Sequence, residues 1–274
     1  MPELPEVETV VRSLRPHVVG QKVRDVYLSG LPMRMARKLD AKELRRTCVG
    51  ATIRAVRRRG KCILIDFDSG HGVLVHLGMT GRLTVVEERI ERAKHTHVVW
   101  TLSRKRELRF VDPRRFGWVQ AAATVDRLPE VVGLGPDPLA ELDENTLAGL
   151  LDCSRAPIKS FLLDQRRLAG LGNIYVSEAL FRARIHPRTE ARRARKKAGA
   201  LVDAIRETLE LAIVNCGTSF RDFVDGVGES GRNAMALLVY GREGEPCKNC
   251  GAPIRRTVDA GRSTFFCARC QKRY

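Results

Sequence analysis

The chain has 274 residues, enough for two domains of ordinary size, and its hydrophobic content of 43% is typical of a globular protein. Lys and Arg outnumber Asp and Glu by 49 to 32, and the net charge of +17 and isoelectric point near 10.1 favour a nucleic-acid partner over an acidic membrane surface, although a merely well-solvated surface would carry the same charge. No apolar run approaches the ~20 residues of a membrane-spanning helix and the start is unlike a secretory signal, so we expect a soluble intracellular protein.

The first element expected is a short amphipathic helix that begins near Pro5. Apolar residues recur over residues 7–14 at i, i+3, i+4 and i+7, the spacing of one helix face. Proline is favoured in the first turn of a helix, and the carboxylates of Glu3 and Glu6 suit the helix dipole there. Helix stabilisation alone could therefore explain two glutamates at the start of a basic chain.

The remaining elements divide the chain into regions of different pattern. Short β-type runs broken by Gly and Asp follow, so residues 1–125 are expected to form a mostly antiparallel β domain. Residues 126–145 are rich in Pro, Gly and acidic residues and are expected to link two domains. Helical spacing returns over residues 146–236, whereas residues 237–274 are too few for a core of their own.

Four cysteines can stabilise residues 237–274 in place of a hydrophobic core. Cys247 and Cys250 form one CxxC pair, and Cys267 and Cys270 form a second after sixteen intervening residues. This spacing predicts a tetrahedral zinc site with each pair on a tight turn at one end of a β-hairpin. Since four protein ligands leave no position open for water, the zinc is expected to be structural. The hairpin turn would present Arg262 near its tip.

The other cysteines carry no comparable pattern. Cys48, Cys62, Cys153 and Cys216 are isolated, and we expect buried thiols without a special role.

A glycine pattern near residue 228 resembles a dinucleotide-binding fingerprint but lacks its context. Gly226, Gly228 and Gly231 match G-x-G-x-x-G. Because no strand of a βαβ unit precedes them, we interpret the segment as a mobile loop.

Two helices separated by a glycine-rich turn surround Asn173. The amino end of the second helix, with Lys159 nearby, could bind a phosphate. The alternative is that Asn173 is simply a helix cap.

In combination these segments resemble the bacterial formamidopyrimidine-DNA glycosylase family over the full length of the chain. The motifs that carry the resemblance follow in family order: MPELPEVET, RRRGK, HLGMTGRL, KHTHV, DPRRFG, IKSFLLDQ, GLGNIYVSEALF, VYGR and the terminal cysteine pairs. The resemblance implies an α+β fold in which an amino-terminal antiparallel β-sandwich flanked by helices and a helical domain, with a helix-two-turn-helix motif and a β-hairpin zinc finger, enclose a DNA cleft. It further implies a cytoplasmic monomer that acts on damaged double-stranded DNA.

The same resemblance implies the chemistry of the opening stretch. Removal of Met1 would make the secondary amine of Pro2 a nucleophile that attacks the sugar C1′ of a damaged nucleotide, expels the base and forms a Schiff base, after which β- and δ-elimination cut the strand. Glu3 would be the general acid and base, and Glu6 would orient the terminus or hold water. Lys61 would contact phosphate and assist elimination, although by residue type it could be one more solvated cation.

Further residues would hold the DNA. In the family three side chains fill the space left by the extracted nucleotide, and they correspond to Met79, Arg114 and Phe116, of which the first and last could otherwise be core residues. Phosphate contacts are implied for a wider set, and Arg262 also matches the position assigned to δ-elimination. That set is His76, His95, Arg114, Lys159, Asn173 and Arg262.

One loop departs from the family pattern. Where relatives carry an aromatic pair, this chain has Arg232 and Asn233, with Met235 close by, so the loop from Gly228 to Met235 leaves lesion preference open. The favoured hypothesis is a bifunctional glycosylase and lyase for oxidised purines such as 8-oxoguanine and formamidopyrimidines. The alternatives are a relative that acts on oxidised pyrimidines or abasic sites, and a non-catalytic binder of damaged DNA.

Overall fold

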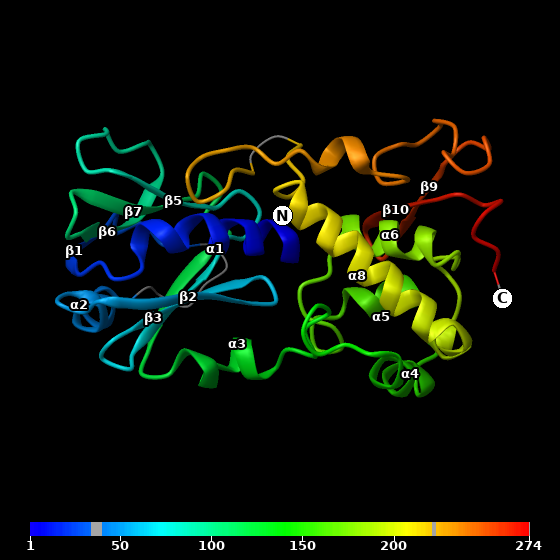
Figure 1. The fold of residues 1–274 in the computed structure, drawn as a ribbon, viewed down its shortest axis with the longest axis horizontal. Helices are drawn as coiled ribbons and strands as arrows, with labels where there is room; N and C mark the ends of the chain where they lie inside the picture. The colour runs from blue at the N-terminus through cyan, green and yellow to red at the C-terminus, as the bar shows by residue number, and fades with distance from the viewer. Residues whose placement is uncertain (34–39, 221–222, 274) are drawn as a thin grey trace. The chain divides into compact units, whose positions relative to one another are not determined.

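The computed structural model describes residues 1–33, 40–220 and 223–273, which divide by their contacts into two compact units (Figure 1). The first unit comprises Met1–Gly133 together with Asn215–Arg232, and the second comprises Leu134–Val214 together with the chain from Asn233 onward. The expected boundaries placed residues 215–232 in the helical region. By contacts, this return segment groups with the amino-terminal unit.

Two four-stranded antiparallel sheets form the first unit, as the short β-type runs predict. Their strand orders are β1-β6-β7-β5 and β2-β3-β4-β8. The strand bounds are β1 Val23–Leu28, β2 Ile53–Arg59, β3 Cys62–Phe67, β4 Gly72–His76, β5 Arg82–Glu87, β6 Thr96–Leu102, β7 Arg106–Val111 and β8 Trp118–Ala122.

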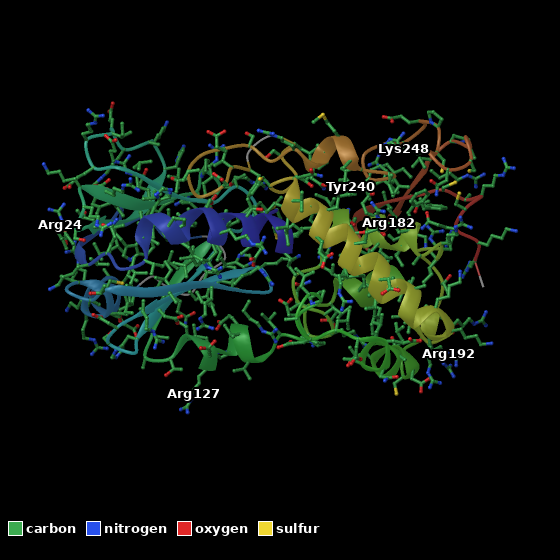
Figure 2. The ribbon with its side chains drawn as sticks, in the orientation of Figure 1. Arg24, Arg127, Arg182, Arg192, Tyr240 and Lys248 are labelled. Carbon is green, nitrogen blue, oxygen red and sulfur yellow. The ribbon has the colours of Figure 1, made fainter. Side chains whose placement is uncertain are left out.

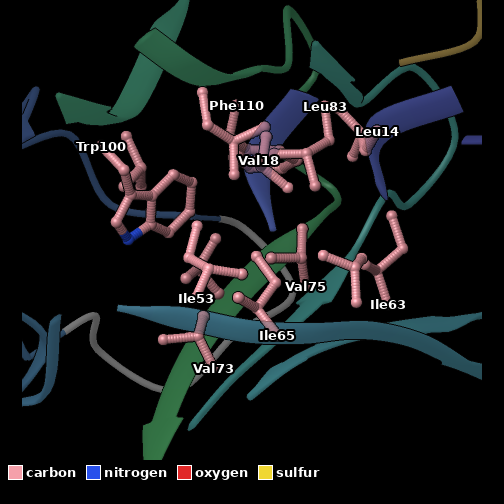
Figure 3. Packing of buried hydrophobic residues seen from close by; sticks show 14 of the residues in the cluster. Leu14, Val18, Ile53, Ile63, Ile65, Val73, Val75, Leu83, Trp100 and Phe110 are labelled. Atoms are coloured by element: carbon pink, nitrogen blue, oxygen red, sulfur yellow. The ribbon is translucent and has the colours of Figure 1, made fainter. Parts of the chain in front are cut away.

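Helix α1, Leu4–Val18, belongs to the same hydrophobic core as both sheets. Figure 3 shows Leu14 and Val18 beside Leu83 and Phe110, and all four side chains are fully buried. Each such burial stabilises the fold by about 1.5–3 kcal/mol, so the apolar stripe of α1 fixes the helix in place. As a consequence, the residues that precede the helix also have a defined position.

The β-type pattern concealed one helix in this region. Helix α2 covers Ala41–Cys48, and its amino-terminal cap is Asp40, whose carboxylate accepts hydrogen bonds from the backbone N–H groups of Lys42 and Glu43. The expected linker region also contains regular structure, a 3₁₀ turn at Val125–Arg127 and helix α3 at Pro129–Val132.

The second unit is helical and ends in a β-hairpin. Its elements are α4 Glu144–Asp152, α5 Ile158–Leu163, α6 Asn173–Arg182, α7 Ala191–Ala194, η2 Arg195–Lys197, α8 Ala198–Val214, η3 Asn233–Ala236, β9 Arg255–Asp259 and β10 Arg262–Phe266. Helix α6 packs against both α8 and β10.

A buried glutamate joins α6 to the segment before the hairpin. Glu178, which is 3% exposed, accepts backbone hydrogen bonds from Leu238, Val239 and Tyr240 at 2.8–2.9 Å. The carboxylate offers enough lone pairs for all three donors. Glu178 therefore anchors the chain that leads from η3 into the cysteine-rich tail.

Two of the four isolated cysteines contradict the prediction of buried thiols. Cys48 and Cys62 are buried, but Cys153 and Cys216 are exposed. Cys153 follows α4 as its carboxyl-terminal cap, and Cys216 has a positive φ of 57° in the return segment. Both residues lie where the chain leaves a helix, so neither contributes to a core.

Basic side chains project outward from both units. Figure 2 shows Arg24, Arg127 and Arg192 pointing away from the ribbon, in keeping with the high positive charge. In the parts of the chain described, the helices are all too short or too polar to cross a membrane.

Candidate functional site

The start of α1 is a buried acidic cap. Pro2 and Glu3 are buried, and Glu3 is the residue that precedes the helix. The backbone N–H of Glu3 donates to Glu6 Oε2 at 2.8 Å. This bond closes the first helical turn and holds the backbone next to Pro2.

Glu6 also connects this turn to the return segment. Its other oxygen, Oε1, accepts a hydrogen bond from the backbone N–H of Thr218 at 2.8 Å, and Glu6 is only 2% exposed. A single buried carboxylate thus satisfies backbone donors from two segments more than 200 positions apart in the sequence. The prediction that Glu6 orients the terminus agrees with these bonds, whereas its pairing with Thr218 had no signal in the sequence.

The return segment packs closely onto α1. Gly226 N–H donates to Ser13 Oγ at 2.7 Å, and a Cβ on Gly226 would lie 2.5 Å from a side-chain carbon of Leu14. A Cβ on Gly231 would lie 2.2 Å from the carbonyl oxygen of Gly217. Close packing therefore explains these glycines without a nucleotide.

Lys61 lies in the tight turn between β2 and β3 and is 8% exposed. A cation so well buried does not fit the alternative of one more solvated lysine. Beside the turn, Arg58 donates to Glu8 at 2.9 Å, and Arg12 donates to the same carboxylate at 2.8 Å. Burial opposes ionisation of Glu8, but these two hydrogen bonds outweigh it and lower the pKa of Glu8.

His76 lies close to Lys61, because its cross-strand partner is Cys62. Its ring stacks on Trp118, with ring centres 3.9 Å apart and planes 12° from parallel. Burial and the charge of Lys61 lower the pKa of His76 to about 4. His76 is consequently neutral at physiological pH.

One buried aspartate brings two exposed turns together. Asp112 is 0% exposed and accepts hydrogen bonds from Thr80 Oγ1 at 2.6 Å, from Arg114 N–H at 3.2 Å and from Gly117 N–H at 2.8 Å. It thereby ties the turn after β4 to the turn after β7. Asp112 was not among the predicted site residues, although it is the first residue of the DPRRFG motif.

The two tied turns carry three of the predicted DNA-contacting side chains of this unit. Met79 is 44% exposed, and the guanidinium carbon of Arg114 lies 4.6 Å from the ring centre of Phe116. Met79 is thus no core residue. His95 is exposed with a φ of 79°, and its carbonyl accepts the N–H of Asp112 at 3.0 Å. Hydrogen bonds of Asp112 thus bring the segments that carry these four side chains close together.

In the second unit, Lys159 and Asn173 converge on β10. Lys159 Nζ donates to Ser263 O at 2.8 Å and to Thr264 Oγ1 at 2.7 Å, and Asn173 Nδ2 donates to the same Ser263 oxygen at 2.9 Å. Both side chains therefore dock the hairpin onto the helices. The alternative that Asn173 is simply the cap of α6 is wrong, because the cap position is Gly172 and Asn173 is the first helical residue.

A small cavity of about 280 Å³ lies beside this junction. Its lining includes Lys159, Asp164, Asp259 and Arg262. Arg262 is exposed and opens β10 opposite Asp259, directly after the hairpin turn. Lys159 and Arg262 thus line one cavity together with two carboxylates, and of the two cations only Arg262 is exposed.

The four predicted zinc ligands lie together in the second unit. The sulfur atoms of Cys247, Cys250, Cys267 and Cys270 are all within 4.8 Å of one another, and one CxxC pair lies on each side of the hairpin. Four thiolates at this separation fit one tetrahedral, structural Zn²⁺. Bound zinc would hold both ends of the hairpin that carries Arg262.

Three family descriptions match successive parts of the chain. They are the Formamidopyrimidine-DNA glycosylase N-terminal domain over residues 1–119, the Formamidopyrimidine-DNA glycosylase H2TH domain over residues 134–224, and the zinc finger found in FPG and IleRS over residues 244–273.

Relatives of known name match the chain over nearly its whole length. A formamidopyrimidine-DNA glycosylase of Rhizorhabdus wittichii is 47% identical and covers 99% of this chain and 100% of its own length. A solved structure of a Lactococcus lactis FPG variant with Fapy-dG containing DNA is 35% identical, with a TM-score of 0.90 and the same coverage. Wild-type Lactococcus lactis FPG with an oxidised pyrimidine containing DNA is also 35% identical, with a TM-score of 0.89 over 99% of this chain and 100% of its own.

Proposed function

Because this chain belongs to the formamidopyrimidine-DNA glycosylase family, and is thus a base excision repair DNA glycosylase and abasic-site lyase, we propose that it removes oxidised purines from duplex DNA with Pro2 as its nucleophile. The observation that carries the assignment of Pro2 is the buried cap at the start of α1. Pro2 and Glu3 are adjacent there, and Glu6 holds the backbone between them and the helix.

The proposed reaction begins once Met1 is removed. A free α-amino group has a reference pKa of about 7.7–8.0, so a neutral fraction of the Pro2 amine is present near pH 7. Its lone pair attacks C1′ of the damaged nucleotide, the bond from C1′ to the base breaks, and the base departs with that electron pair. The Pro2 nitrogen then loses its proton, and its lone pair forms the iminium with C1′ as the bond from C1′ to the sugar ring oxygen breaks. Glu3 supplies the proton that this ring oxygen takes up, and it later accepts a proton.

Strand cleavage follows from the covalent intermediate. The iminium between Pro2 and C1′ makes the neighbouring sugar protons acidic, so their loss expels first the 3′ and then the 5′ phosphate by β- and δ-elimination. We assign the contact with a phosphate during these steps to Lys61, and assistance to the second elimination to Arg262. A positive charge at each position favours departure of an anionic phosphate.

Extraction of the nucleotide from the base stack costs a few kcal/mol. We propose that contacts from the two turns held by Asp112 offset this cost. Met79 and Phe116 have the apolar surface to fill the gap in the base stack, and Arg114 has the donors to bond the orphaned base. The hydrogen bonds by which Asp112 joins the two turns, and the contact between Arg114 and Phe116, support a joint role.

Phosphate contacts by His76, His95, Lys159, Asn173 and Arg262 would fix the flipped nucleotide's backbone. We expect affinity to fall steeply with salt, since Lys and Arg contacts release counterions from DNA. We place the enzyme in the bacterial cytoplasm, as a monomer bound to chromosomal DNA.

Lesion preference is the part of this proposal that needs its own experiment. Arg232 is exposed, Asn233 is buried and Met235 is 81% exposed, where an aromatic pair is common in the family. Single-turnover base excision should be measured on matched duplexes with 8-oxoguanine, a formamidopyrimidine or an oxidised pyrimidine, and strand cleavage on a duplex with an abasic site. Fastest excision of the two purine lesions supports the proposal, and faster excision of the pyrimidine would replace it with the altered-lesion alternative.

A further inference from the structure

His76 and Trp118 form a cross-strand aromatic pair whose geometry goes beyond ordinary packing. The two residues lie directly opposite each other on β4 and β8. Their near-parallel rings, 12° apart in tilt, hold the imidazole in one plane. Both residues are only partly buried, so the stack is not sealed inside the core.

A hydrogen bond selects the tautomer of this imidazole. The backbone N–H of Gly78 donates to His76 Nδ1 at 3.1 Å, so Nδ1 carries a lone pair and the ring proton resides on Nε2. The position of the donor is fixed, since Gly78 has a φ of 65° and a Cβ there would lie 2.4 Å from the backbone nitrogen of Gly117. In a doubly protonated ring, the Nδ1–H donor of His76 would face the backbone N–H donor of Gly78.

The surrounding charge favours the same neutral form. Lys61 precedes Cys62, the partner of His76 on β3, and is itself buried. A second positive charge beside Lys61 would be repelled and poorly solvated, and the pKa of His76 is accordingly lowered to about 4.

We propose that Trp118 is a positioning residue that, together with the Gly78 amide, presents His76 as a neutral imidazole whose Nε2–H donates to a DNA phosphate. This rests on the proposed phosphate contact of His76 and specifies its chemistry. The contact is a directional hydrogen bond without charge, and Lys61 supplies the cation at this place. It follows that His76 contributes to affinity but not to the salt dependence of binding.

The first test is made on the free protein with ¹⁵N-labelled histidine. Long-range ¹H–¹⁵N spectra should give His76 the Nε2–H pattern from pH 8 down to about pH 5. Trp118→Phe keeps a ring to stack on and should retain this pattern. Trp118→Leu should give mixed tautomers and protonation at higher pH, with an unchanged fold by circular dichroism. An Nδ1–H pattern in the wild type, or identical spectra for Trp118→Leu, would overturn the positioning role.

The second test uses a duplex with an uncleavable abasic-site analogue. His76→Gln retains a neutral donor and should bind with the wild-type slope of log K against log salt. His76→Ala should lose up to about tenfold in affinity at that same slope. A slope reduced by about 0.9 in His76→Gln would show a charged histidine and refute the proposal.

The two tests separate this inference from the proposed function. Unchanged affinity in His76→Ala would refute the donor role even if the spectra confirm the tautomer. Failure of the wild type to cleave any lesion duplex would refute the proposed function, and it would leave the spectral result for Trp118 standing.

Discussion

Replacing Glu6 with glutamine tests whether one buried carboxylate holds the start of α1 to the return segment. Glu6 Oε2 and Oε1 accept the backbone N–H groups of Glu3 and Thr218, each at 2.8 Å. The side chain of glutamine has one oxygen and one NH₂ group. The backbone N–H of either Glu3 or Thr218 would therefore face the NH₂ donor and lose its acceptor. Loss of a charge-assisted bond plus a buried unsatisfied N–H should lower the free energy of unfolding by about 2–3 kcal/mol.

Tryptophan fluorescence is the appropriate probe for this measurement. The chain has two tryptophans, Trp100 and Trp118, and both lie in the first unit with Glu6. Urea unfolding followed by their emission therefore reports on this unit. The slope against urea should be unchanged, with the midpoint moved to lower urea.

Glu8→Gln is the matched control, two positions along the same helix. Glu8 bonds to Arg12 and Arg58, and its side chain is 13% exposed. Glutamine at this position keeps one oxygen that can accept from Arg58, and the exposed Arg12 can turn to water, so Glu8→Gln should cost only about 1 kcal/mol. Equal losses in the two variants, or a loss below about 0.5 kcal/mol for Glu6→Gln, would refute the reasoning.

Three further predictions concern the zinc site, the hairpin anchor and pH. Elemental analysis should find one zinc ion per wild-type chain and none in Cys250→Ser, which should also lose DNA binding, whereas Cys153→Ser, at an exposed cysteine, should change neither. Glu178→Gln should expose the tail to limited proteolysis, since three backbone donors lose their charged acceptor, and an unchanged cleavage rate would contradict this. The folded-state pKa of Glu8 lies below its ordinary 4.5, so its contribution is present above that pH and is lost as pH falls through the lowered value. The difference in unfolding free energy between wild type and Glu8→Gln should accordingly shrink below pH 4.5, and a difference that grows there would contradict the assignment.

Local patterns in the sequence were enough to predict the zinc ligands and helix α1. The zinc ligands follow from the spacing of two CxxC pairs, and α1 follows from its apolar periodicity, because each depends on residues close together in the chain. Both are confirmed. Resemblance supplied the assignments of Pro2, Glu3 and Lys61, whose chemistry stays a prediction.

Long-range contacts could not be predicted in this way. The bond from Thr218 to Glu6 and the ties made by Asp112 join segments that no periodicity relates. The residue type of Asn173 suggested a helix cap as the alternative to a phosphate contact, but its amide donates to β10 instead. The exposure of Cys153 likewise depends on where a helix ends, which sequence patterns place poorly.

The central claim is that the Pro2 amine forms the covalent intermediate. Borohydride added during incubation with an 8-oxoguanine duplex should trap a protein–DNA adduct, and after digestion peptide mass spectrometry should place the sugar remnant on the amino-terminal peptide at Pro2. Protein that retains Met1 should form no such adduct. A remnant located on Lys61 or another lysine, or no adduct with any lesion, would contradict the account.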